Sequence, residues 1–325
     1  MTKLIGRLES IGVGKESSRG TAVAPTYWIP WLDLKLDNKV NLIKNEASVG
    51  RLEDSDGSVV TGKYGEAEIM SKIKDKSFGL FLLSCLGTCT TDANADGSGL
   101  VYDHAFTVLQ SSQHPTLTLA HKSANDDVAY ANALVDSLKF GIKYGEYAYF
   151  TAKLMSKASA SASNTVSHTA ENDFVAQNVT FKKATTQSGL DAASAIKIRE
   201  LSLEINNSAM FEYVLGSVAP NDVLNQGFNV KGNITLVHND ATFADMQNNE
   251  TYNALRFDLV NSAVTIGTSA NPRLKIDLNR VRISNYERKM KLNDLVEESF
   301  DFDAHYSLTD SKMLTITLTN LASSY

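Results

Sequence analysis

The chain has few of the residues that reinforce small secreted domains. Of its 325 residues, two are cysteines, five are prolines and two are tryptophans. The cysteines, Cys85 and Cys89, are separated by three residues. That spacing matches neither the CxxC redox motif nor the cysteine pattern of a disulfide-rich domain. We therefore expect both thiols to be small buried side chains.

A surplus of positive charge is also missing. The formal net charge is -6, from 31 basic and 37 acidic residues, whereas tight binding to a phosphate backbone needs an electropositive surface. The start, MTKLIGRLES, has no apolar signal region, and the apolar run Leu80–Leu83 is far too short to cross a bilayer. We expect a protein made in the cytoplasm, without a membrane partner, that tolerates nucleic acid rather than gripping it.

Motifs for catalysis and cofactor binding are absent as well. The segment GVGKES superficially suggests a phosphate-binding loop. A Walker motif, however, needs Gly five residues before Gly14 and Ser or Thr directly after Lys15, where this chain has Glu9 and Glu16. No GxSxG elbow or HExxH helix occurs. The sequence therefore predicts a protein that is not an enzyme, with no catalytic and no cofactor-binding residues.

The histidines are scattered along the chain without a zinc-ligand spacing. We expect isolated structural roles for all six, which are His104, His114, His121, His168, His238 and His305.

One acidic stretch matches part of a calcium-binding loop. Asp92, Asn94, Asp96, Gly97 and Asp103 stand at positions one, three, five, six and twelve of such a loop. Against calcium binding, a leucine occupies a usual ligand position and the closing residue is Asp rather than Glu. A polar surface turn is the favoured interpretation, calcium binding stays open, and no metal ligand is assigned.

The dominant pattern is a period of two, which is typical of strands that bury one face. Apolar and polar residues alternate through Leu138–Tyr144, and Gly145–Glu146 then leads into Tyr147–Leu154, which predicts a hairpin. Phe228–Leu236 and Phe300–Leu308 alternate in the same way. The fold class is therefore mainly β.

Two of these strands change phase. Within Ala195–Asn206 the apolar face shifts by one residue near Arg199–Glu200, and Leu274–Leu278 gives way to a shifted series from Val281. A β-bulge absorbs such a slip. Bulged, strongly bent strands favour a β-barrel or a coiled β-sandwich.

Helix is predicted at only two places, one in each half of the chain. In Ser77–Leu86 a capping Ser precedes apolar residues at helical spacing, and Gly87 supplies the stop. Ala241–Asn249 is a weaker second helix.

A stretch of small polar residues, Lys157–Thr169, divides the chain because it cannot bury enough surface to order itself. We predict an amino-terminal arm over 1–32, a β domain over 33–156, a linker over 157–170 and a second β domain over 171–325.

The elements on either side of this linker recur in the same order, which favours a tandem duplication. Residue identity is weak, and a loose alignment of two unrelated β-rich halves remains the alternative. The matched segments are Asp33–Asn41 with Ile196–Asn206, Gly65–Lys74 with Gly227–His238, the two helices, and the hairpin near Ala133 with the strands near Leu295.

The amino-terminal segment IGVGKESSRGTAVAPTYWIP resembles the start of many tail tube proteins of long-tailed bacteriophages. The segments SFGLFLLSCLG, ALVDSLKFGIKYGEYAYFTAKL, IKIRELSLEINN and NDVLNQGFNVKGNITLVHND are similar to that family's strand and turn blocks. The matching positions of the first segment are Gly12, Gly14, Glu16, Gly20, Thr21, Ala22 and Pro25.

This resemblance implies a β-sandwich or barrel with one short helix per repeat, closed into a six-fold ring. A duplicated chain would give that ring from three copies, and a single-unit chain from six. The implied role is the major tail tube subunit of the virion tail. Its implied partners are itself, tape measure and tail tip or terminator proteins, and DNA that passes without specific binding. A decoration or surface-binding β-protein of a phage is the alternative.

The first thirty residues also contain aromatic side chains, at Tyr27, Trp28 and Trp31. They suit either an arm that docks on a neighbouring subunit or a first strand with two core tryptophans.

Overall fold

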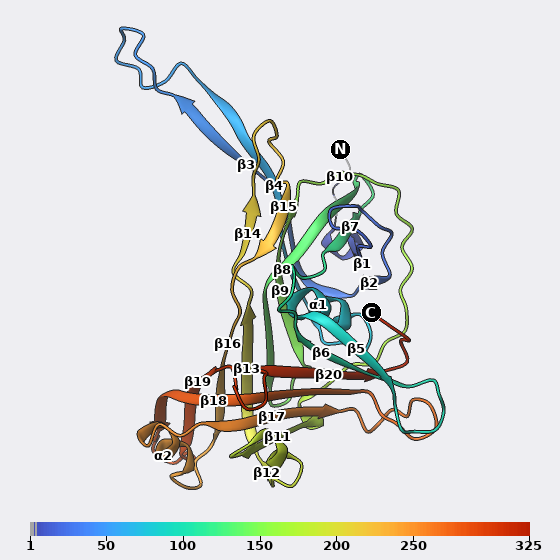
Figure 1. The fold of residues 1–325 in the computed structure, drawn as a ribbon, viewed down its shortest axis with the longest axis vertical. Coiled ribbons are helices and arrows are strands. Elements are labelled where there is room, and N and C mark those ends of the chain that lie inside the picture. The colour runs from blue at the N-terminus through green and yellow to red at the C-terminus, as the bar shows by residue number, and fades with distance from the viewer. Residues whose placement is uncertain (1–2, 4) are drawn as a thin grey trace.

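The computed structural model describes residue 3 and residues 5–325. Strand makes up 53% of the structure and helix 8%, and the prediction of a mainly β fold with a short helix in each half is confirmed (Figure 1). The first half contains β1 (Ser10–Lys15), β2 (Tyr27–Ile29), β3 (Trp31–Asn45), β4 (Gly57–Lys72), α1 (Phe78–Leu86), β5 (Gly87–Ala93), β6 (Tyr102–Val108), β7 (Leu117–Lys122), β8 (Asp127–Lys143), β9 (Tyr149–Lys157) and β10 (Ala160–Ser161). The second contains β11 (Val179–Ala184), β12 (Ala195–Ile196), β13 (Ile198–Asn206), β14 (Ala209–Glu212), β15 (Asp222–Asn225), β16 (Asn229–Val237), α2 (Thr242–Asn248), β17 (Asn253–Val260), β18 (Arg273–Lys289), β19 (Glu297–Ala304) and β20 (Leu314–Asn320).

The strands of the first half form two antiparallel ladders that share one long strand. The order β3-β4-β9-β8 makes the first ladder. The order β1-β7-β8-β10 makes the second. Because β8 pairs with β7 up to Ala133 and with β9 from Leu134 onward, it bends from one ladder into the other.

The second half repeats this pattern of pairing. Its first ladder has the order β13-β16-β19-β18. Its second has the order β11-β17-β18-β20. The long strand β18 plays the part of β8, and α2 follows β16 as α1 follows β4.

The irregularities of the ladders also correspond. A bulge lies between Trp31 and Asp33 where β3 pairs with β4, and another lies between Ile198 and Glu200 where β13 pairs with β16. Likewise, the register with the preceding strand shifts between Tyr130 and Ala133 of β8 and between Leu278 and Val281 of β18. The two phase slips in the sequence are therefore bulges, as predicted.

The halves join edge to edge. Strand β8 pairs antiparallel with β13, from Lys143 opposite Glu200 to Ser137 opposite Asn206. This junction makes one eight-stranded sheet of order β3-β4-β9-β8-β13-β16-β19-β18. A second contact comes from β6, which pairs with β20 of the other half.

The two helices differ in burial. All nine residues of α1 are buried, and Gly87 ends it in the left-handed region, with φ 94°. Of α2, Phe243 and Met246 are buried. The predicted capping role of Ser77 is wrong, because its side chain donates to the Glu171 carboxylate (3.0 Å) instead of the helix backbone.

The amino-terminal segment packs within its own chain rather than as a docking arm. Strand β1 pairs with β2 and β7, Trp28 is buried, and Trp31 lies half-buried against the same core. The Trp31 indole donates to the Glu9 carbonyl (3.0 Å). Within the single chain this segment fits the alternative of a first strand, with Trp28 in the core and Trp31 packed against it.

The segment 157–170 is not the unstructured linker that its composition predicts. Its β10 pairs with β8, and the Asn164 N–H donates to the Asp127 carboxylate (3.0 Å). The segment is ordered by hydrogen bonds to the first half and contributes that half's last strand, because β10 occupies the place that β20 has in the second half.

Two further expectations need correction. The hairpin that contains Ala133 corresponds to β18 and β19, which begin at Arg273, and not to strands beginning near Leu295. The alternation through Leu308 also overruns its strand, since β19 ends at Ala304 and the side chains of Tyr306 and Leu308 are exposed.

Candidate assembly surfaces

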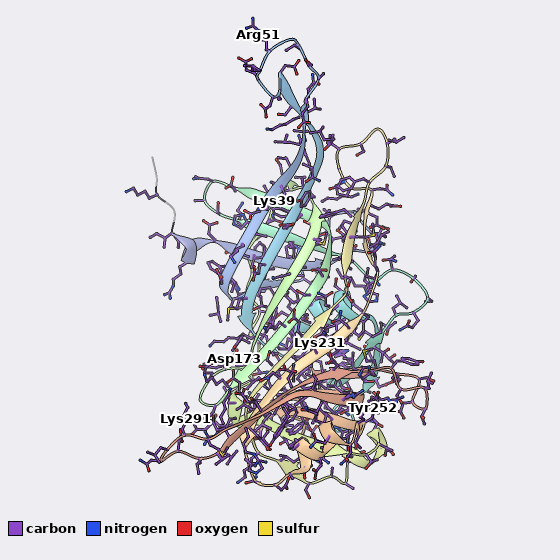
Figure 2. All side chains as sticks on the ribbon, turned by 90° about the vertical axis from the view of Figure 1, so that its left-hand side faces the viewer. Lys39, Arg51, Asp173, Lys231, Tyr252 and Lys291 are labelled. Carbon is purple, nitrogen blue, oxygen red and sulfur yellow. The ribbon has the colours of Figure 1, made fainter. Side chains whose placement is uncertain are left out.

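One face of the eight-stranded sheet is polar. The strands run side by side below the long hairpin that carries Lys39 and Arg51, and Lys231 lies farther down (Figure 2). Three shallow hollows line this face in series. The first and second share Glu68 and Lys153, and the second and third share Ser202 and Glu204. The polar side of the alternation thus forms one continuous surface across both halves.

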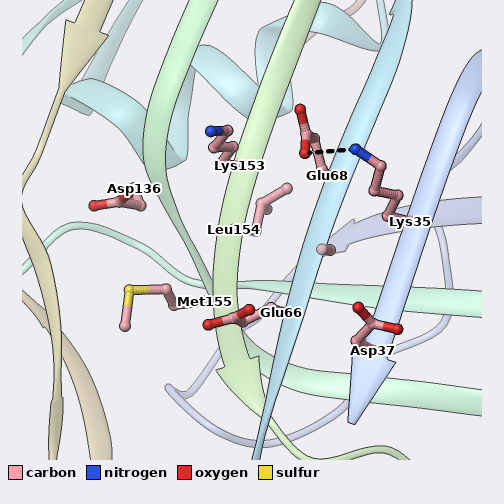
Figure 3. Close-up of a pocket in the computed structure, with 9 residues that line it drawn as sticks. Lys35, Asp37, Glu66, Glu68, Asp136, Lys153, Leu154 and Met155 are labelled. Atoms are coloured by element: carbon pink, nitrogen blue, oxygen red, sulfur yellow. Dashed lines mark hydrogen bonds and ion pairs between the residues drawn. The ribbon is translucent and has the colours of Figure 1, made fainter. Parts of the chain in front are cut away.

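The three hollows of this surface are lined by more carboxylates than lysines. In the first hollow, Lys35 pairs with Glu68 at 3.3 Å (Figure 3); the Lys35 side chain is exposed and that of Glu68 is half-buried. Carboxylates around the three hollows outnumber lysines by eight to four. They are Asp37, Glu66, Glu68, Asp136, Glu200, Glu204, Asp301 and Asp303, against Lys35, Lys139, Lys153 and Lys231.

The sheet ends in two open edges. Within residue 3 and residues 5–325, β3 pairs with β4 alone, and β18 beyond Arg282 pairs with β19 alone. The unpaired N–H and C=O groups of such an edge are a template for another strand. Both edges are therefore candidate contact surfaces.

The hairpin of β3 and β4 projects from the body (Figure 1). Its outer part exposes large apolar side chains that no part of the described chain covers, namely Val40, Leu42, Ile43, Val49, Leu52 and Val59. We call residues 40–60 the arm. Contiguous exposed apolar groups of this kind mark contact sites with other proteins.

The corresponding hairpin of the second half, β14 and β15, is shorter and lies on the first half. Phe211 packs on Tyr64 with ring centroids 4.6 Å apart. The Lys63 N–H donates to the Val218 carbonyl at 2.7 Å. The hairpin that extends the second half therefore covers part of its neighbour, whereas the arm of the first half has no neighbour in the chain.

A family model of phage tail tube proteins matches residues 6–304. The chain belongs to the phage tail tube protein family. A search of curated proteins gives no significant match. Membership makes this chain a structural protein of the phage tail that assembles into a tube, and it confirms the resemblance of the amino-terminal and strand segments.

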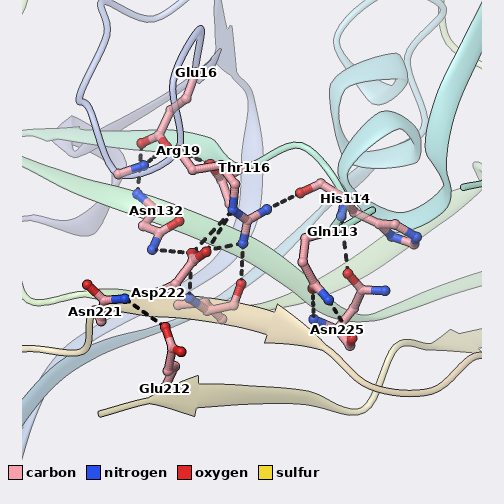
Figure 4. A network of polar contacts seen from close by, with 12 residues as sticks. Glu16, Arg19, Gln113, His114, Thr116, Asn132, Glu212, Asn221, Asp222 and Asn225 are labelled. Carbon is pink, nitrogen blue, oxygen red and sulfur yellow. Dashed lines mark hydrogen bonds and ion pairs between the residues drawn. The ribbon is translucent and has the colours of Figure 1, made fainter. Parts of the chain in front are cut away.

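In this tail tube protein a buried polar network holds the two halves together (Figure 4). Glu16 is 5% exposed and accepts hydrogen bonds from the hydroxyls of Thr116 (2.6 Å) and Thr118 (3.0 Å) and from the Asn132 N–H (2.7 Å). Its neighbour Arg19 forms a two-pronged ion pair with Asp222 of the second half. Glu16, Arg19 and Asn132 thus link β1, β8 and β15.

Burial of Asp222 raises its pKa, but hydrogen bonds from Arg19 and Asn132 outweigh that effect and hold the pKa below its usual range. The Asp222 carboxylate therefore stays charged in the folded tail tube protein. Because it is ionised and doubly hydrogen-bonded, this contact is stronger than a neutral one.

The stretch that resembles a calcium loop forms the hairpin turn between β5 and β6. Asn94 donates to Asp103 at 2.8 Å, while Asp96 accepts the Thr268 N–H at 2.9 Å. Hydrogen bonds from Thr268 and from Ser98 lower the pKa of Asp96 despite a weaker opposing effect of burial. In residue 3 and residues 5–325, no three His, Cys, Asp or Glu side chains are grouped as metal ligands.

The cysteines and histidines lie in separate environments. Cys85 is fully buried and Cys89 half-buried, and both thiols are free; burial raises the pKa of both. Of the histidines, His104 bonds to Thr91 and Asn320, His121 to Glu9 (2.9 Å) and His238 to Glu298 (2.8 Å).

Over the described part of the chain, no helix is long and apolar enough to span a membrane.

Sequence reasoning missed the open edges and the arm. Alternation identifies which face of a strand is buried, but it does not say which strand lacks a neighbour. A signal for the arm was present, since Val40, Leu42, Ile43, Val49 and Leu52 are large apolar residues within an otherwise polar stretch.

Proposed function

We propose that the chain is the major tail tube subunit, and that it stacks in rings around the channel through which DNA is ejected. The observation that carries this proposal is the eight-stranded sheet with one polar face and an open edge at each side. A curved sheet closes into a barrel only when every edge finds a partner, and copies of the same chain supply one in a ring.

The ring contains three chains and six similar domains, because the chain is a tandem duplication. Support comes from the repeated ladders and from the repeated bulges at Trp31/Asp33 and Ile198/Glu200. Two unrelated β-rich halves would have no reason to share both the order of pairing and the positions of the irregularities. A closed ring fixes the number of domains, so a duplicated chain halves the number of subunits.

The polar face of the sheet lines the channel. The hollows of this face carry eight carboxylates against four lysines, and such hollows repel DNA phosphates, whereas a basic wall would bind them and release counterions. The wall therefore lets DNA pass without specific binding. The same channel accommodates the tape measure protein before ejection, and the ends of the tube contact tail tip and terminator proteins.

In the assembled tube the arm contacts another copy of the chain, which covers its apolar side chains. The subunit is made in the host cytoplasm and acts in the virion tail, without a catalytic role.

Electron microscopy of the purified chain tests this function. Hollow tubes or rings whose averaged end views show six similar densities, with three chains per ring by native mass spectrometry, are expected. Six chains per ring would contradict the duplication and leave the tube intact. A strictly monomeric chain at high concentration and in several salts would contradict the tube itself and favour a surface-binding module.

The channel wall has its own test. Replacing Glu200 and Glu204 with Lys is expected to preserve folding, because both side chains are exposed, and to make the tubes retain DNA at low salt. A matched change of two exposed acidic residues that line none of the hollows, Glu146 and Asp245, to Lys is the control for net charge. Equal DNA retention by both variants would place the polar face away from the channel.

A further inference from the structure

The two strands that form the internal junction, β8 and β13, are the equivalents of the two strands whose outer edges are unpaired, β18 and β3. β8 and β18 occupy equivalent places in the two halves, and so do β13 and β3. Within the chain, the edge of a β8-type strand already pairs with the edge of a β13-type strand. The unpaired edges belong to β18 and β3. They are therefore equivalent to the two edges that already pair inside the chain.

We propose that Glu287–Lys289 of β18 pairs antiparallel with Lys35–Asp37 of β3 in a second copy of the chain, in the register of the internal junction. This inference rests on the proposed ring and names the strand contact that closes it. The partner is a second copy of the chain, because its β3 is the strand that is equivalent to β13.

The register follows from the corresponding bulges. Asp33 and Glu200 each follow the bulge of their strand, so Asp37 corresponds to Glu204. In the other pair of strands, Lys139 lies opposite Thr151 of β9 and Glu287 lies opposite Ser299 of β19, at equivalent rows of the two ladders. Because Glu204 lies opposite Lys139 in the internal junction, Asp37 lies opposite Glu287 in the outer one.

The neighbouring pairs follow from this one. Gln247 of α2 already accepts the Tyr286 N–H at 2.7 Å, so the pairing is counted from Glu287 onward. The expected pairs are Asp37 with Glu287, Leu36 with Arg288, Lys35 with Lys289, Leu34 with Met290, and Asp33 with Lys291.

The chemistry at one end of this pairing matches the internal junction. Leu34 opposite Met290 corresponds to Leu201 opposite Ile142. Met290 is 72% exposed in the single chain, whereas Ile142 is 8% exposed, so the pairing would bury a side chain that now lies in water. Asp33 opposite Lys291 repeats the acid–base pair of the internal junction.

The rest of the pairing holds two lysines and two carboxylates in a square on the polar face, while Leu36 lies opposite Arg288 between them on the other face. Directly opposite residues have like charge, but each charge has an opposite one on the diagonal, at about 7–8 Å between backbone positions and within reach of long side chains. Lys289 already contacts Glu287 at 3.4 Å along its own strand. The square has no net charge, so it does not oppose the contact as a block of like charges would.

Cysteine cross-linking tests both the partner and the register. The background variant is Cys89→Ser, since Cys85 is fully buried. One chain carries Asp37→Cys and Glu287→Cys, which lie opposite in the proposed register, and the matched control carries Lys39→Cys and Glu287→Cys, which are displaced by two residues. A disulfide within one chain is excluded, because these edges are separated by seven strand spacings, or about 34 Å along the sheet.

The expected result on oxidation is a ladder of covalent oligomers ending at a closed species, formed about tenfold faster by the first variant than by the control, because a disulfide needs closely placed Cβ atoms. Faster cross-linking of the control would overturn the register. Failure of both variants in preparations that electron microscopy shows as tubes would overturn the strand pair and leave the tube function standing. Absence of tubes in the background variant and in the unmodified chain would overturn both.

Discussion

The two halves share their ladders and bulges but differ wherever one half meets another. The first half has a long bare arm, and the second has a short hairpin that packs on Tyr64. The first half also inserts β5 and β6 after its helix, and β6 extends the ladder of the second half through β20. The ladders are the common framework, and the departures from it build contacts between neighbouring units.

The arm is where this difference should have its largest effect. Replacing Leu42 and Ile43 with Ser is expected to leave folding stability within about 0.5 kcal/mol, because both side chains are exposed. The same change should raise the protein concentration needed for tubes about tenfold or more, since burial of apolar side chains is the main favourable term in protein association. Sedimentation across a concentration series measures it.

The control for the arm is Leu100→Ser, which removes an exposed apolar side chain from the turn between β5 and β6. Unchanged tube formation is expected. If Leu100→Ser weakens assembly as much as the arm variant does, the arm has no special part in it.

The helices offer the next comparison. Phe81 of α1 is fully buried and packs on Phe150 with centroids 4.9 Å apart, and Phe243 of α2 stacks on Phe300 at 4.6 Å. Phe→Ala in a core costs about 3–5 kcal/mol. We expect Phe81→Ala at the upper end and Phe243→Ala lower, because the partly exposed surroundings of α2 can close over the lost ring. Urea unfolding measures both, and a larger cost at Phe243 would reverse this ranking of the helices.

Each half also buries an ionisable side chain, Arg256 in the second half and Glu16 in the first, and the two have different kinds of partner. In the second half Arg256 binds Asp277 through two nitrogens, at 2.5 and 3.0 Å, with both side chains 6% exposed. Arg256→Met is expected to destabilise by about 3 kcal/mol, because it leaves Asp277 without a counter-charge.

The double variant Arg256→Met with Asp277→Leu should recover most of that stability. In the first half, Glu16→Gln should cost less, about 1–3 kcal/mol, because Glu16 is held by neutral donors and its loss removes hydrogen bonds without stranding a charge. Denaturant midpoints compare the three. An equal cost for Glu16→Gln and Arg256→Met would show that the type of partner does not matter.

The smallest effect expected is on pH dependence, at the contact between β6 and the second half. Burial lowers the pKa of His104 below its ordinary value of 6.5, and hydrogen bonds to Ala322 and Asn320 offset this only in part. Below that pH the unfolded chain binds more protons than the folded one. Stability contributed by neutral His104 is therefore complete above about pH 6.5 and declines as the pH falls.

Thermal unfolding between about pH 7 and pH 5 measures this slope. His104→Gln is expected to make it shallower, whereas His305→Gln, at an exposed position, should leave it unchanged. A steeper slope for His104→Gln would contradict the assignment.

Much of this frame could be predicted from the sequence, because alternation and its slips are local. The bulges near Arg199 and after Leu278, the hairpin of β8 and β9 and both helices come from such patterns. The locations of Trp28 and Trp31 could not, since an apolar side chain does not specify which chain covers it.

The ordering of 157–170 was hidden for a similar reason. Its small polar residues are held by Asp127, which is distant in sequence, so composition alone suggested disorder. The polar face and its edges depend on how ladders join, and no single strand carries that information. The contact of Asp96 likewise depends on a distant residue, because its carboxylate accepts the N–H of Thr268 in the other half.

The tether between β10 and β11 has a kinetic consequence for the proposed ring. Because one chain carries both halves, the β8–β13 junction forms at the effective concentration set by a short connection, of the order of millimolar, independently of how much protein is present. Only the outer junctions depend on collisions between molecules. A ring of three such chains therefore forms in two encounters, whereas a ring of six single domains needs five, so ring formation should remain efficient early in infection, when subunits are still scarce.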